Sequence, residues 1–244
     1  MNTSAIAPGT RSVYGIDVTV SAVSVVRIAE SDPVLKAAAV LVTSDAGAVH
    51  TVASTLQKLT AAADSVTAAV LARGVPSVVV MSKGLWNDMR ADPSASRRLA
   101  LWWFIADRLR SEGAPIAEFP LPTLTTWARG GSGKSTGKML EHQGLLAKEL
   151  WPAVGELAAP FRPGTALLAA AGAMAVGIGT PVAPTQERLN ILRGYDSPEA
   201  TQRSNKAIQW PAHRKPPRTV EGWNRLHAEG LSAVAETDEL SVAS

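Results

Sequence analysis

Residues 13–26 read VYGIDVTVSAVSVV, and this stretch decides the fold class. Its β-branched residues alternate with smaller ones until Gly15 and Asp17 interrupt the pattern, which is typical of a strand, a short turn and a returning strand. We therefore expect a β-hairpin here. Residues 37–43, AAAVLVT, are a candidate third strand.

Outward from the hairpin, a long helix leads into a buried strand. Residues 50–73 place Val52, Leu56 and Leu59 at helical spacing, and Gly74 ends this segment. Residues 75–81, VPSVVVM, then form a short and continuous apolar run, as expected of a central strand that is covered on both faces. The order is strand, strand, strand, helix, strand.

The second half of the chain adds mainly helices. We expect helices at 96–112, 135–150 and 165–178, a short helix within 121–128 and a brief strand at 115–119. The uncharged stretch 163–186 contains a helical run too short to cross a bilayer, which needs about 20 apolar residues. We interpret this run as a buried core helix and predict no membrane contact.

Length and composition allow one large domain with an appendage. We expect a flexible N-terminus at 1–12, a core domain at 13–187 and a C-terminal extension at 188–244. The chain has no cysteine, which excludes disulfides, thiolate metal sites and cysteine nucleophiles. Its first residues lack an apolar segment after a basic start, so we expect a cytoplasmic protein rather than a secreted one.

A Gly-rich segment suggests one alternative, an NTPase. Residues 128–135, ARGGSGKS, satisfy a loose form of the phosphate-binding P-loop. However, Ala128 replaces the first glycine, residues 124–127 do not form a buried strand pattern, and no apolar run ending in Asp follows. A basic loop that precedes a helix is the simpler interpretation.

The order of these features resembles phage RuvC-type Holliday junction resolvases, over about residues 13–210. The resemblance is carried by Gly15-Ile16-Asp17 on the first strand, the Val-rich central strand, Pro122-Thr123-Leu124, and the loop around Gly131-Ser132-Gly133 with Lys134 or Lys138. It implies an α/β fold of the RNase H-like class: a mixed sheet flanked by helices, here with an extended basic C-terminal arm. The host of such a phage would be a bacterium.

The resemblance also implies chemistry that this sequence supports poorly. The family hydrolyses a phosphodiester with two divalent metals, which need several converging carboxylates. Asp17 stands at the first acidic position, but Ser82-Lys83 replace the acid after the central strand, and residues 162–167, RPGTAL, lack the acids expected before the last core helix. We therefore predict a degenerate site. Asp17 is its catalytic remnant, and the site has too few metal ligands to retain Mg²⁺ or Mn²⁺.

Basic residues are the candidate contacts to nucleic acid or a partner protein. The loop and the helix after it supply Arg129, Lys134 and Lys138, and an acid-free stretch, 201–220, supplies the rest. Prolines at 211, 216 and 217 disfavour a helix in that stretch and predict an extended arm, although a solvated tail explains the charges equally well. The arm residues are Arg203, Lys206, Arg214, Lys215 and Arg218.

Tryptophans outside the regular helices are further candidates for partner contact, and the histidines are not. Trp86, Trp127, Trp210 and Trp223 lie in segments with weak periodicity. The four histidines have no metal-ligand spacing, so we assign them no catalytic role.

Two functional hypotheses follow from this resemblance. The first is a non-catalytic, RuvC-like accessory protein of DNA recombination that binds DNA and/or a site-specific recombinase, for example as a recombination directionality factor, and uses no cofactor. The second is an active, Mg²⁺- or Mn²⁺-dependent Holliday junction endonuclease in which Asp17 acts with acids such as Asp88, Asp92 or Glu118. Because resolvases of this type act as dimers, homodimerisation stays open under both.

Overall fold

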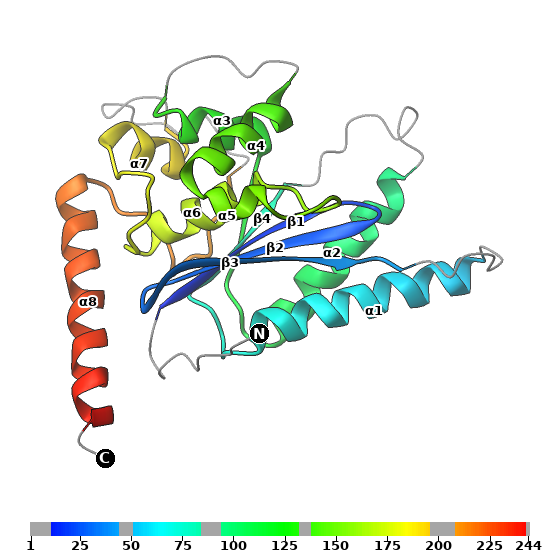
Figure 1. Cartoon of the computed structure of the whole chain (residues 1–244), viewed down its shortest axis with the longest axis horizontal. Helices are drawn as coiled ribbons and strands as arrows, with labels where there is room; N and C mark the ends of the chain where they lie inside the picture. Colours follow the sequence, from blue (N-terminus) through cyan, green and yellow to red (C-terminus); the bar gives the residue numbers. More distant parts are fainter. Residues whose placement is uncertain (1–10, 44–50, 84–93, 132–137, 196–207, 243–244) are drawn as a thin grey trace.

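The computed structural model of the chain describes residues 11–43, 51–83, 94–131, 138–195 and 208–242. Five strands form one sheet with eight helices around it in this part of the chain (Figure 1). The strands are β1 (Ser12–Val18), β2 (Ala22–Ala29), β3 (Asp32–Leu41), β4 (Val78–Ser82) and β5 (Ile116–Phe119). The helices are α1 (Val52–Leu71), α2 (Ala95–Ser111), α3 (Leu121–Ala128), α4 (Met139–Leu150), α5 (Pro152–Gly155), α6 (Thr165–Ala175), α7 (Gln186–Arg193) and α8 (Val220–Val242).

The sheet is mixed, with the order β3-β2-β1-β4-β5. The first three strands are antiparallel neighbours, whereas β4 is parallel to β1 and β5 is parallel to β4. This strand order and these directions are those of the RNase H-like fold, so the predicted fold class is confirmed. The predicted hairpin is β1 and β2, and the predicted central strand is β4.

Two cores cover the two faces of the sheet. Side chains of alternate strand residues pack against α1 and α2 on one face, and the other alternate set packs mainly against α3 and α6 on the opposite face. Figure 1 shows the same division, with α1 and α2 below the strands and the group of α3 to α7 above them. Strand β4 is therefore apolar from Val78 to Met81, as the sequence predicted.

Helix α6 lies closer to the sheet than a helix with ordinary side chains can. A Cβ atom added at Gly15 would lie 2.5 Å from the backbone nitrogen of Ala169, and one added at Gly172 would lie 2.8 Å from Val80 Cγ2. All eleven residues of α6 are buried. Glycine at these positions allows the close approach, and the prediction of a buried core helix here is confirmed.

Several predicted boundaries are wrong by a few residues. Strand β3 begins at Asp32 rather than residue 37, and it includes Pro33, which a strand at the edge of a sheet tolerates. Strand β4 begins at Val78 rather than residue 75, because Pro76 and Ser77 precede the parallel pairing with β1. Helix α4 begins at Met139 rather than residue 135.

The C-terminal region contains an extended stretch followed by a helix that the sequence analysis missed. Residues 208–219 contain no helix, as the prolines predicted, and Gln209 forms an isolated antiparallel bridge with Glu118 of β5. Helix α8 follows, with Trp223 buried in the core. The predicted domain boundary at 187–188 falls within α7, where Arg188 donates hydrogen bonds to the carbonyl oxygens of Trp127 and Ala128.

Arg11 attaches the start of β1 to this C-terminal region. Its guanidinium forms an ion pair with Glu30 and donates hydrogen bonds to the carbonyl oxygens of Val176 and Leu226, at 2.7 and 2.9 Å. The first and last described parts of the chain are therefore joined directly. None of the helices in the described residues is both long and apolar enough to span a membrane.

Candidate functional site

Three polar residues lie side by side where β1, β2 and β4 meet α6. Side chains alternate between the faces of a sheet, so Asp17 shares a face with Val13 and Gly15, which pack towards α6. The strand register pairs Asp17 with Ser24 of β2, and its extension along β4 brings Ser82 beside Asp17. All three residues are buried.

The carboxylate of Asp17 has a partner on each oxygen. Ser82 Oγ donates a hydrogen bond to Oδ1 at 2.7 Å, and Arg162 Nη1 donates to Oδ2 at 3.0 Å. The predicted placement of Asp17 and Ser82 on adjacent strands is confirmed. The contact with Arg162 joins residues 145 positions apart and pairs the buried carboxylate with a cation.

Arg162 is held in this position from both of its ends. Its backbone N–H donates to Ser24 Oγ at 2.8 Å, while its guanidinium contacts Asp17. The side chain of Asp17 is 7% exposed and that of Arg162 is 39% exposed, so the guanidinium is the outward end of the ion pair. Together with residues from α3, α4 and α6, the pair borders a hollow of about 110 Å³.

The residues present do not fit a two-metal site. Such a site needs several carboxylates with oxygens directed at the ions, whereas here one carboxylate is occupied by a serine and an arginine. Glu118 forms an ion pair with Lys83 at 3.7 Å, and Asp88 and Asp92 lie outside the described residues. No group of three or more acidic, histidine or cysteine side chains able to hold a metal is present in the described ranges.

The structure places only some of the predicted basic contacts. Arg129 is exposed at the end of α3, and Lys138 immediately precedes α4 and pairs with Glu141 at 3.5 Å. Lys134, Arg203 and Lys206 fall outside the described residues.

Arg214, one of the arm residues, lies at the other end of the sheet from Asp17. Arg214 donates a hydrogen bond to the carbonyl oxygen of Ser77, which precedes β4, whereas Ser82 ends β4 beside Asp17. Five residues of strand separate these ends by about 16 Å at ~3.3 Å per residue. Lys215 and Arg218 are exposed in the same stretch. Arg214 therefore does not form one cluster with Asp17 and Arg162.

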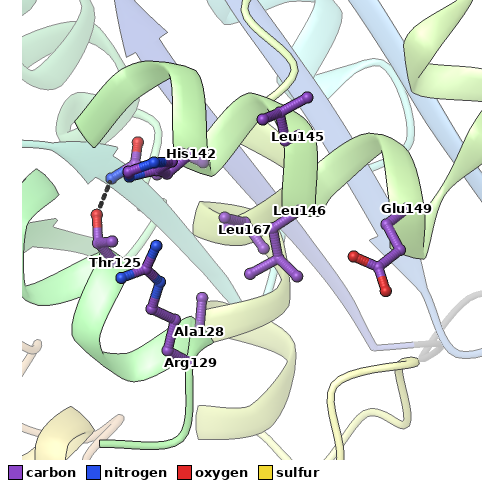
Figure 2. A pocket seen from close by; sticks show the side chains of 9 residues that line it. Thr125, Ala128, Arg129, His142, Leu145, Leu146, Glu149 and Leu167 are labelled. Carbon is purple, nitrogen blue, oxygen red and sulfur yellow. Dashed lines mark hydrogen bonds between the residues drawn. The ribbon is translucent and has the colours of Figure 1, made fainter. Parts of the chain in front are cut away.

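A second hollow, of about 230 Å³, lies between α3 and α4 (Figure 2). Arg129 reaches towards it from the end of α3, and α4 contributes His142, Leu145, Leu146 and Glu149. Beneath it, the buried Gln143 donates hydrogen bonds from Nε2 to the carbonyl oxygen of Leu121 and to Thr125 Oγ1, both at 2.8 Å. The hollow is therefore a gap between two helices that buried hydrogen bonds hold together.

The segment before the Gly-rich loop is helical. Residues 121–128 form α3, whereas a P-loop follows a buried strand. The structure thus agrees with the sequence-based argument against an NTPase.

The hypothesis of partner contact is wrong for Trp127 and Trp223. Trp127 is completely buried and Trp223 is 7% exposed, because both complete the apolar core. Trp210 is partly buried and donates a hydrogen bond to the carbonyl oxygen of Leu192. Trp86 lies outside the described residues, and the exposed tryptophan of α2, Trp103, was assigned to the helix rather than to partner contact.

With the fold and the site described, known proteins provide a comparison. The chain is similar in structure to RuvC. A structure of Thermus thermophilus RuvC in complex with Holliday junction substrate aligns with a TM-score of 0.46 and 17% identity, over 66% of this chain and 90% of that chain. A second structure of Thermus thermophilus RuvC aligns with a TM-score of 0.43 and 19% identity, over 65% of this chain and 90% of that one. No family model and no curated protein sequence matches the chain.

Arg162 is the site residue that sequence reasoning missed. In the sequence, residues 162–167 are notable only for their lack of acids. A signal was present, since a lone acid on a buried strand needs a cation or several donors, and Arg162 is the basic residue nearest to the start of the buried helix.

Proposed function

We propose that this protein is a non-catalytic, RuvC-like accessory protein of DNA recombination, of phage origin, that binds DNA and/or a site-specific recombinase. One observation supports the loss of catalysis above all others. The remaining acid of the expected site, Asp17, has one carboxylate oxygen bonded to Ser82 and the other to Arg162.

The physical argument is one of charge. Two divalent ions bring four positive charges, and closely spaced carboxylates must offset them. Here Arg162 already offsets the charge of Asp17, and Lys83 adds a second cation directly after Ser82. A divalent ion placed beside Asp17 would be repelled by the guanidinium, so we expect metal affinity and cleavage to be lost together.

Binding is the function that such a scaffold can retain. Exposed cations, among them Arg129, Lys215 and Arg218, are suited to phosphates or to acidic protein surfaces. A recombination directionality factor, which binds a recombinase and changes its outcome, is the concrete form we favour. Its contacts would combine a protein surface with the DNA backbone.

A labelled four-way junction, incubated with the full chain in Mg²⁺ and in Mn²⁺, provides the test. We expect a gel shift without cleavage, and recovery of the protein with phage recombinases in a pull-down. Cleavage that disappears in Asp17→Asn would instead establish the alternative, an active metal-dependent Holliday junction endonuclease. A chain that binds neither junction, duplex nor recombinase would contradict the proposal.

A further inference from the structure

We propose that Arg162 forms a phosphate-binding site at the ends of strands β1 and β4 and binds a backbone phosphodiester of DNA without any divalent metal. The inference rests on the proposed function, since it assumes that DNA is a ligand. It extends that function by naming the contact that replaces the metals.

Arg162 has hydrogen-bond donors to spare. A guanidinium carries five N–H donors in a fork that matches the oxygens of a phosphate. Within the described part of the chain, the guanidinium donates only to Asp17, through Nη1. Four N–H donors therefore have no acceptor there.

The surroundings orient these donors outwards. Asp17 is buried beneath the guanidinium, and the backbone bond to Ser24 holds the residue from the other side. A guanidinium with one contact already fixed loses little rotamer freedom when it binds a second anion. Asp17 thus acts as a positioning residue for Arg162.

The adjoining hollow limits the size of the ligand. Its walls include Leu140, Phe161 and Pro163, and its volume of about 110 Å³ is small. Pockets that enclose drug-sized molecules measure about 300–1,000 Å³. The hollow therefore suits one phosphate group of a polymer and not a whole nucleotide.

The charges at this edge determine how strong the effect will be. Asp17 and Glu118 balance Arg162 and Lys83, so the edge has no large positive field. The site contributes one directed contact to an affinity that other cations share. We expect its removal to weaken binding about three- to ten-fold and to lower the slope of log affinity against log salt by about one.

The experiment measures the binding of a fluorescent four-way junction to the full chain by anisotropy, over a range of salt. Arg162→Gln is the first variant. Because it leaves a buried carboxylate unpaired, the double variant Asp17→Asn with Arg162→Gln removes both charges and keeps a polar pair in place. The matched control is Arg110→Gln on α2, which removes an exposed arginine from the opposite face of the sheet.

We expect the double variant to show weaker binding and the smaller salt slope, and the control to match the wild type. Wild-type binding should persist in EDTA, because no divalent ion takes part in the contact. If the double variant keeps the wild-type affinity and slope, or if EDTA abolishes wild-type binding, the phosphate site is refuted and the proposed function survives. If the wild type binds no DNA, DNA binding itself fails, and this inference fails with it.

Discussion

Removing Arg162 should destabilise the protein through Asp17. In Arg162→Met the ion pair is lost, and a carboxylate that is 7% exposed retains the hydrogen bond from Ser82 alone. Breaking a fully buried pair costs about 3–5 kcal/mol. Because the Arg162 side chain is 39% exposed, water can partly replace it, and we expect a loss of about 2 kcal/mol in the free energy of unfolding.

The reverse change should be milder. Asp17→Asn preserves the shape of the side chain and leaves an arginine that water can hydrate, so we expect a loss of about 1 kcal/mol. If the two residues interact directly, the double variant should lose about 1.5 kcal/mol rather than the sum of about 3 kcal/mol. The difference is a coupling of about 1.5 kcal/mol.

Urea unfolding of the four proteins, followed by tryptophan fluorescence and circular dichroism, measures this cycle. For a chain of this length, a loss of 2 kcal/mol lowers Tm by about 4–8 °C, which a thermal scan also detects. Additive losses, with a coupling below about 0.5 kcal/mol, would refute the ion pair as the element that neutralises Asp17. So would an Arg162→Met protein as stable as the wild type.

Four further substitutions test the packing and the titration of the core. Gly15→Ala should destabilise the fold by several kcal/mol in urea unfolding, because its Cβ would lie within 2.6 Å of two backbone atoms of α6. Gly172→Ala should destabilise it less, since the side chain of Val80 can move. Equal losses in the two variants would contradict this ranking. Gln143→Met should lower the free energy of unfolding by about 1–3 kcal/mol, because the two acceptor oxygens on α3 lose their buried donor. An unchanged urea midpoint would contradict this expectation. Burial raises the pKa of Tyr14 from its usual 10.0, and this effect exceeds the lowering by Arg27. The folded state therefore favours the neutral phenol. The resulting stability is complete below pH 10 and is lost as the pH rises through the folded-state pKa. Tyr14→Phe should remove this loss in unfolding curves recorded from pH 8 to 11, and an identical pH dependence would contradict it.

The central strands and the long helices were predictable because burial imposes a simple pattern. The hairpin and β4 are apolar runs of strand length, and α1 and α2 show helical spacing before a glycine. The ends of the strands were less predictable. A proline usually marks the end of a strand, but the outer strand β3 continues through Pro33. Helix α8 was missed because its periodicity is weak: few apolar residues besides Val220 and Trp223 mark its inner face in the first two turns.

In the site, the neighbours Asp17 and Ser82 were predictable from the sequence, whereas the contact with Arg162 was not. Alternation along the strands put Asp17 and Ser82 together, and this follows from local pattern plus strand order. The contact of Arg162 with Asp17 depends on where the turn before α6 returns to the sheet, and Gly15 decides that distance. The count of acids therefore predicted a degenerate site, whereas only the tertiary structure showed that Arg162 is the partner of Asp17.

The bridge between Gln209 and Glu118 has a consequence for solubility. An outer strand exposes unpaired backbone groups, to which a strand of another molecule can add. On the outer side of β5, the backbone N–H of Glu118 donates to the carbonyl oxygen of Gln209 at 2.9 Å, and the N–H of Gln209 donates to the carbonyl oxygen of Glu118 at 3.0 Å. The C-terminal segment thus occupies the middle of a four-residue edge and leaves a foreign strand too few adjacent groups on which to start. Loss of this bridge would uncover the backbone groups of Glu118 and favour self-association through β5.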